Sequence, residues 1–187
     1  MLDLHELAPE LPRLLKRWEF ERMLEMGFFE DERVELLRGV VVRMTPPSPP
    51  HDATLQRLTR IFVHAVGERG WVRVGSAWAA NEDSEPLPDL SVVPPGDYDA
   101  EHPTNAWLIV EVARSSLRKD RSIKRALYAE CGVAEYWIVN LVDGVIEVHT
   151  GPGTVGYAKQ TTFRRGERIR LGTLPDVVID VDAVLPA

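Results

Sequence analysis

The chain has little sulfur chemistry and no segment suited to a membrane. Its single cysteine, Cys131, excludes an internal disulfide framework and a cysteine-built zinc site. No apolar run approaches the roughly 20 residues that a membrane-spanning helix needs. The N-terminal stretch also lacks the basic region followed by an apolar core that is typical of a signal peptide. We therefore expect a cytoplasmic protein with no membrane partner.

Positive charge is also scarce. The 22 Lys and Arg residues are outnumbered by 29 Asp and Glu residues, and the formal net charge is -7. Phosphate contacts need cations, so this balance does not favour a nucleic-acid partner. A metal site built from carboxylates, however, would be acidic by construction. One basic block, "RKDRSIKR" at 118–125, stands out.

The remaining composition is that of an ordinary globular protein. The 187 residues are 44% hydrophobic and 27% charged, which suits one domain with a sizeable core. We expect residues 1–187 to form a single domain, with 1–30 as a helical N-terminal extension. No internal repeat or low-complexity segment is present.

Apolar periodicity predicts an alternation of helices and strands. Helices are expected over 14–26, 51–70 and 115–132, and the connector 45–50 is too rich in proline to continue either neighbouring element. Strands are expected at 71–74, 90–93, 107–113, 156–163 and 168–171. Hairpins are expected over 33–44, turning at Arg38-Gly39, and over 134–150, turning at Asp143-Gly144. This order predicts an α/β fold with a mixed sheet flanked by helices.

Two stripes can be distinguished on the helix expected over 115–132. Ile123, Leu127 and Cys131 form the apolar stripe that we expect to face the sheet. Asp120, Lys124 and Tyr128 form a second stripe beside it. By itself the spacing of Asp120 and Lys124 fits an exposed ion pair.

Two of the apolar strands carry a carboxylate. Glu111 lies in "WLIVEVA", where both faces of the strand are otherwise apolar. A buried carboxylate needs an ion-pair partner, hydrogen bonds, a metal or a proton. A buried salt bridge or an emerging strand end explains Glu111 as well as a functional role does. Asp89, after Pro88, fits a solvated strand start, and the dipeptide recurs at 175–176.

Other charged residues allow a functional interpretation. Glu35, in "RVELLRG", is best explained alone as an exposed position on the outer face of its hairpin. Oxygen ligands from several chain segments are what Mg²⁺ requires. Lys124 could lean toward such a metal, where its compact charge could hold an attacking water. His51 could approach the same place, although a capping or surface role is favoured.

The stretches "PDLSVV", "IVEVARSSLRKDRSIKRALYAECGVAEYWIVN" and "VIEVHTGP" resemble the Uma-type restriction endonuclease family. That family is similar to the PD-(D/E)XK nuclease superfamily, and the resemblance extends from about Glu32 to the tail. It implies a restriction-endonuclease-like α/β/α sandwich with a central mixed β-sheet. It also implies that Asp89 and Glu111 hold Mg²⁺ or Mn²⁺, with the Val112 carbonyl as a further ligand. Glu35 matches the N-terminal acid of the family.

The lysine of the superfamily pattern is displaced in this chain. The pattern places it two residues after the acid, and that position is Ala113 here. The Uma-type family commonly carries a lysine on the following helix, and Lys124 matches it. Arg114 follows the strand and could reach a phosphate.

We therefore expect a Mg²⁺-dependent endonuclease that hydrolyses DNA phosphodiester bonds. Its expected catalytic residues are Asp89, Glu111, Lys124 and Glu35, and its expected accessory residues are His51, Asp120, Tyr128 and Arg114. The alternative is a catalytically inactive nuclease-fold protein that binds a partner or self-associates. The net charge and Ala113 favour that alternative, and a homodimer would offer a way to build a DNA groove.

Overall fold

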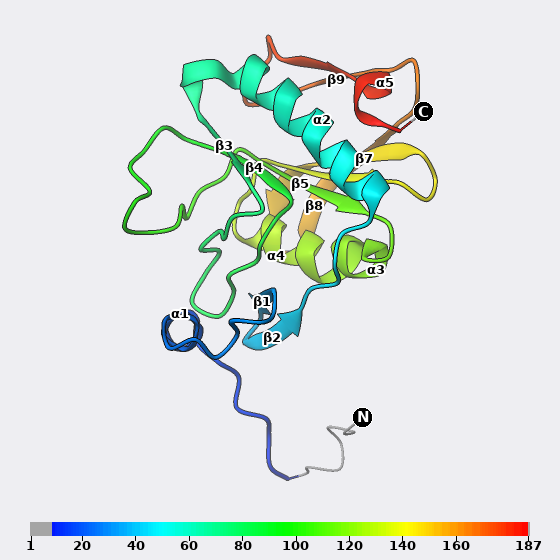
Figure 1. The fold of residues 1–187 in the computed structure, drawn as a ribbon. Helices are drawn as coiled ribbons and strands as arrows, with labels where there is room; N and C mark the ends of the chain where they lie inside the picture. The colour runs from blue at the N-terminus through cyan, green and yellow to red at the C-terminus, as the bar shows by residue number, and fades with distance from the viewer. Residues whose placement is uncertain (1–8, 187) are drawn as a thin grey trace.

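A computed structural model of the chain describes residues 9–186. At its centre is a six-stranded mixed sheet in the order β3-β4-β5-β6-β7-β8 (Figure 1). The pair β5–β6 is parallel, and every other neighbouring pair is antiparallel. The first part of the expected N-terminal extension, residues 1–8 with His5, lies outside the described residues. The strands are β3 (Trp71–Val74), β4 (Leu90–Val93), β5 (Leu108–Ala113), β6 (Glu135–Asn140), β7 (Val145–Gly153) and β8 (Gly156–Phe163).

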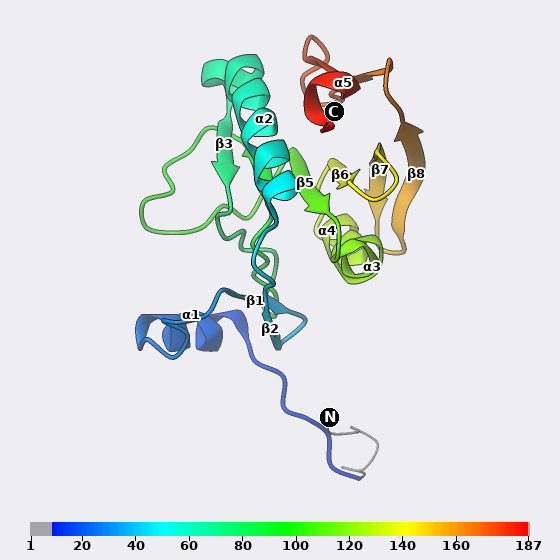
Figure 2. The ribbon, with the colours of Figure 1, turned by 45° about the vertical axis from the view of Figure 1, so that its right-hand side comes forward.

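Helices cover both faces of this sheet. The long helix α2 (Pro49–Val66) and the short α5 (Val181–Val184) lie on one face, and α3 (Leu117–Lys119) and α4 (Arg125–Glu130) lie on the other (Figures 1 and 2). Side chains of β5 alternate between the two layers. Val112 packs with Phe62 of α2, whereas Ile109 packs with Tyr128 of α4. The predicted α/β/α sandwich is therefore confirmed.

Two small hairpins complete the fold. β1 (Val34–Leu37) pairs with β2 (Val40–Arg43) through the predicted turn, where Arg38 and Gly39 both have positive φ. The helix α1 (Arg17–Glu25) packs its buried Phe20 against β1 (Figure 1). β9 (Arg168–Arg170) pairs with β10 (Val178–Asp180), so the C-terminal tail belongs to the packed core. In the described range, no helix is both long and apolar enough to span a membrane.

The connector expected over 45–50 is shorter than predicted. Helix α2 begins at Pro49, so Pro49 and Pro50 belong to its first turn. Proline is accepted there because the first amide groups of a helix have no intrahelical partner. Conversely, α1 begins at Arg17 rather than at Leu14, whose side chain is exposed.

The helix expected over 115–132 is interrupted. A π turn, Asp120–Lys124, separates α3 from α4, and the Arg125 N–H donates to the Asp120 carbonyl across it. Our prediction that Ile123 faces the sheet is wrong, because its side chain is 46% exposed. The wider turn shifts the stripes that an ideal helix would show. Asp120, Lys124 and Tyr128 are buried instead.

Candidate functional site

The neighbouring strands β4 and β5 bring the two predicted acids together. Their register pairs Leu90 with Val110, and continuing it by one residue sets Asp89 opposite Glu111. Residues directly opposite in an antiparallel pair point to the same face of the sheet. The Asp89 carboxylate is fixed there, because the Val112 N–H donates to its Oδ2 at 2.7 Å.

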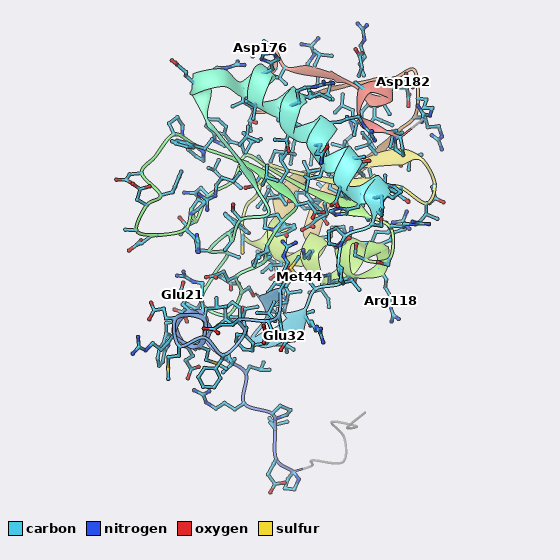
Figure 3. The ribbon with its side chains drawn as sticks, viewed as in Figure 1. Glu21, Glu32, Met44, Arg118, Asp176 and Asp182 are labelled. Atoms are coloured by element: carbon cyan, nitrogen blue, oxygen red, sulfur yellow. The ribbon has the colours of Figure 1, made fainter. Side chains whose placement is uncertain are left out.

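Both acids line a pocket of about 130 Å³ below the start of α2. One wall is the connector between β2 and α2, including Met44, which lies between the small hairpin and the sheet (Figure 3). The opposite wall is the segment that runs from β5 into the π turn. The pocket therefore lies where three segments distant in sequence meet. The predicted site residues that line it are His51, Asp89, Glu111, Val112, Arg114, Asp120 and Lys124.

Lys124 reaches the acids from the π turn. Its Nζ lies 2.8 Å from Glu111 Oε1 and 3.0 Å from Glu35 Oε2. Burial lowers the pKa of Lys124, but the attraction of Glu111, Glu35 and Asp120 outweighs burial and raises that pKa. Lys124 is therefore a charged ammonium, and the alternative of an exposed pair with Asp120 is wrong.

Glu35 lies behind the pocket, completely buried. It accepts a hydrogen bond from the Lys119 Nζ at 2.5 Å and is ion-paired with Lys124. Burial raises the pKa of Glu35, but the two lysines outweigh it and lower that pKa, so the carboxylate stays ionised. The interpretation of Glu35 as an exposed residue is wrong. Lys119 was missed by the sequence reasoning, although it lies in the basic block.

Glu111 has two donors on one oxygen. The Lys124 Nζ and the Tyr128 hydroxyl, at 2.7 Å, both donate to Oε1. Burial raises the pKa of Glu111 to about 8 against the attraction of Lys124. Within residues 9–186 no donor is bonded to Oε2, so this oxygen is available to a ligand. A cation bound there would displace a proton from Glu111.

Asp120 is also buried at this place, with 1% of its surface exposed. Neither carboxylate oxygen has a hydrogen-bond partner in the described part of the chain. Burial raises the pKa of Asp120, and the attraction of Lys124 opposes that rise. Buried polar atoms without partners are costly, so this carboxylate is a candidate contact for water or a ligand in the pocket.

His51 enters the site from the first turn of α2. Its Nε2 lies 3.1 Å from Asp89 Oδ2. The hydrogen bond to Asp89 raises the pKa of His51 in spite of its partial burial. The favoured interpretation of His51 as a capping or surface residue is therefore incomplete, since the ring contacts a predicted metal ligand.

Free cations lie at the mouth of the pocket. Arg33 and Arg114 line it, are exposed, and form no ion pair with any described residue. Arg118 extends from α3 away from the protein (Figure 3). Two arginines without an ion-pair partner among the described residues therefore stand at the pocket in spite of the acidic total charge.

Comparison with known proteins identifies the family. The model of the Uma2 family, described as "Putative restriction endonuclease", matches residues 18–182. The chain belongs to the Uma2 family. Among curated proteins, none matches.

A solved structure shares the fold of this Uma2 protein. It is the crystal structure of a protein described as "a putative nuclease belonging to DUF820" from Anabaena variabilis ATCC 29413. The TM-score is 0.69 at 13% identity, and the match covers 92% of this chain and 97% of the other. Identity this low supports the common fold alone.

The donor set of this Uma2 protein fits a hydrated hard cation. Asp89 and Glu111 would supply carboxylate oxygens and Val112 a carbonyl, and Mg²⁺ commonly binds through one or two carboxylates while keeping several waters. Across the described residues, no group of three or more His, Cys, Asp or Glu side chains is arranged to hold a metal. The site therefore suits a cation completed by water and substrate, and does not suit a closed structural metal.

Proposed function

We propose that this Uma2 protein is a metal-dependent endonuclease that hydrolyses DNA phosphodiester bonds. The observation that carries the proposal is the meeting of Asp89, Glu111 and the charged Lys124 at one pocket. Membership of the Uma2 family supports the nuclease class. Arg33 and Arg114 at the mouth support a polyanionic substrate, because guanidinium groups suit phosphate oxygens.

The residues of the pocket would have different roles in catalysis. Asp89, Glu111 and the Val112 carbonyl would hold Mg²⁺ or Mn²⁺. Such a cation, when bound, polarises a phosphoryl oxygen and lowers the pKa of water. Lys124, held by Glu35 and Glu111, keeps a positive charge at the pocket wall, where it would stabilise charge developing on phosphate.

Further residues would hold the metal ligands and Lys124 in position. Lys119 forms a second ion pair with Glu35, so Lys124 is not the only cation that Glu35 needs and can also face the pocket. Tyr128 holds Glu111 Oε1, which directs Oε2 to the cation. His51 restrains the Asp89 carboxylate. Arg114 would contact a phosphate beside the scissile bond.

The test is DNA cleavage with purified protein in Mg²⁺ or Mn²⁺. We expect Glu111→Gln to lower the rate at least about 100-fold, because a lost metal ligand costs several kcal/mol of transition-state stabilisation. The matched control is Glu68→Gln, which makes the same change at an exposed glutamate outside the pocket. Equal cleavage by wild type and Glu111→Gln would indicate a contaminating nuclease and would contradict the proposal.

A second candidate function is non-catalytic binding or self-association. The observation in its favour is that Glu111 has Lys124 and Tyr128 as partners, and Asp89 has His51 and the Val112 N–H, so the protein itself compensates both acids. Calorimetry with Mg²⁺ and sedimentation of the purified chain separate the two functions. Metal binding that is lost in Glu111→Gln supports the nuclease, whereas a homodimer that binds no Mg²⁺ supports the alternative.

A further inference from the structure

A second acidic cavity, of about 490 Å³, lies away from the strand ends. Its walls are α1, the segment 79–85 and the loop 98–104, and it shares no residue with the pocket around Asp89. Main-chain hydrogen bonds fix these walls. The Arg17 N–H donates to the Glu82 carbonyl at 2.7 Å, and the Ala79 N–H donates to the Pro103 carbonyl at 3.0 Å. The cavity is therefore a formed part of the fold.

The cavity has a large excess of negative charge. Glu21 and Glu25 of α1 and Asp99 and Glu101 of the loop line it, together with Glu85. The arginine that lines it, Arg17, is already paired with Glu21 at 2.7 Å. Figure 3 marks Glu21 on α1. A ligand that enters this space must bring positive charge.

Glu85 is the residue that most needs a partner. It is 1% exposed, and its Oε2 has no hydrogen-bond partner among residues 9–186. Its backbone is held on both sides, because its N–H donates to the Leu36 carbonyl at 2.8 Å and its carbonyl accepts from the Leu36 N–H. This pairing fixes the backbone of Glu85 at the inner wall, and a donor in the cavity would satisfy its free carboxylate oxygen.

A proton on Glu85 partly compensates for the lack of a cation beside its carboxylate. Burial, and then the neighbouring Glu21 carboxylate, raises the pKa of Glu85 to about 7. A carboxyl group with a pKa near 7 is partly protonated at neutral pH. A ligand with N–H donors and a positive charge would replace that proton and satisfy Oε2.

We propose that this cavity binds a linear aliphatic diamine or polyamine, with one ammonium group donating to Glu85 and another near Asp99 and Glu101. Separate acids at the inner wall and on the loop match a ligand with charges at both ends. Leu24, Ala79 and Ala100 line the space between and can cover the methylene groups.

The first test is calorimetric titration of the full chain with 1,4-diaminobutane. We expect binding by wild type and at least about tenfold weaker binding by Glu85→Gln, a loss of one ion pair. Glu68→Gln removes an equal charge from an exposed position and should change the affinity less than about twofold. 1,4-Butanediol, which has the same chain length without charge, should not bind.

The second test measures proton release, which unspecific attraction would not cause. At neutral pH the diamine should displace the proton held by Glu85, so the binding enthalpy should depend on the buffer in wild type and much less in Glu85→Gln. Besides Glu21, the charged and titratable groups that line the cavity with Glu85 are Arg17 and Glu25 from α1 and Asp99, Glu101 and His102 from the loop.

Several outcomes would overturn the proposal. These are no binding of the diamine at millimolar concentration, equal weakening by Glu85→Gln and Glu68→Gln, or equal binding of the diol. If Glu85→Gln does not fold, Asp99→Asn in the exposed loop takes its place, and unchanged affinity then contradicts the proposal. Glu111→Gln should leave diamine binding unaltered, which separates this result from that of the nuclease test.

Discussion

The two acidic cavities compensate buried carboxylates in different ways. At the strand ends, Glu35 and Glu111 are neutralised by lysines that the fold supplies, above all Lys124. In the cavity beside α1, Glu21 and Glu85 have one arginine, and a proton takes the place of a second cation. The lysines keep Glu35 ionised, whereas Glu85 has no lysine beside it among the described residues and its pKa is raised to about 7. At the strand ends the fold itself supplies the lysine that pairs with the buried carboxylates. In the described part of the chain the cavity beside α1 has no such lysine, and there we propose that a cationic ligand binds.

Removing the built-in cation should give the largest effect on stability. Lys124→Met leaves Glu35, Glu111 and Asp120 buried without their common counter-charge, and losing one partner of a buried pair costs about 3–5 kcal/mol. Urea unfolding measures the loss. Lys159→Met, at an exposed position on β8, is the control and should stay within about 0.5 kcal/mol of wild type.

The double variant Lys124→Met with Glu111→Gln sharpens this result. Removing one of the stranded carboxylates should restore part of the lost stability, so the two changes should be less than additive. Strict additivity would mean that the Lys124–Glu111 contact contributes nothing to the folded state.

The proton in the second cavity should appear as a pH dependence of stability. The pKa of Glu85 is raised from 4.5 to about 7, so the folded chain holds this proton more tightly than the unfolded chain does. Its stabilising contribution is complete below pH 4.5 and is lost as pH rises through about 7. Between about pH 5.5 and about pH 8 the free energy of unfolding should fall by about 2 kcal/mol from this group.

Urea unfolding at both pH values tests this prediction. Glu85→Gln should flatten the profile by that amount, because a glutamine does not titrate. Glu68→Gln should leave the slope as in wild type. A profile equally steep in Glu85→Gln and wild type would assign the pH dependence to other groups.

The smallest effect concerns the second donor on Glu111. Tyr128→Phe removes the hydroxyl that donates to Oε1 but leaves the Lys124 bond, so we expect a loss of about 1 kcal/mol. Thermal unfolding measures this loss. Tyr157→Phe is the control, since it removes a hydroxyl that donates to the Val133 carbonyl rather than to a carboxylate. A loss several times larger for Tyr128→Phe than for Tyr157→Phe would show that Glu111 depends on both of its donors.

The sheet and its two acids were predictable because they depend on local pattern. Apolar runs of four to six residues and the Asp143-Gly144 turn are visible in the sequence, and the structure has them where expected. The meeting of Asp89 and Glu111 follows from pairing adjacent strands. Their metal remains a prediction, supported by the resemblance rather than by any contact.

The contacts that hold Glu35 and Lys124 in place were less predictable, because they depend on long-range packing and on one irregular turn. The burial of Glu35 requires the small hairpin to dock against Lys119 and Lys124, which are more than 80 residues away in sequence. The prediction that Ile123 faces the sheet assumed the period of a regular α-helix, which the π turn changes. Similarly, Glu21 and Glu85 become neighbours only when α1 packs on the segment after β3, so neither residue looked unusual alone.

The π turn at Asp120–Lys124 also bears on how such a chain could lose its site over evolutionary time. The turn holds one residue more than an α-helical turn would, and Lys124 reaches Glu35 and Glu111 from it. Deleting one codon within the turn would restore a regular helix and rotate the lysine by about 100° relative to the sheet. The helix and the sandwich would survive, but the contact between lysine and carboxylates would not. A single codon thus separates a chain with an assembled site from one that keeps only the architecture.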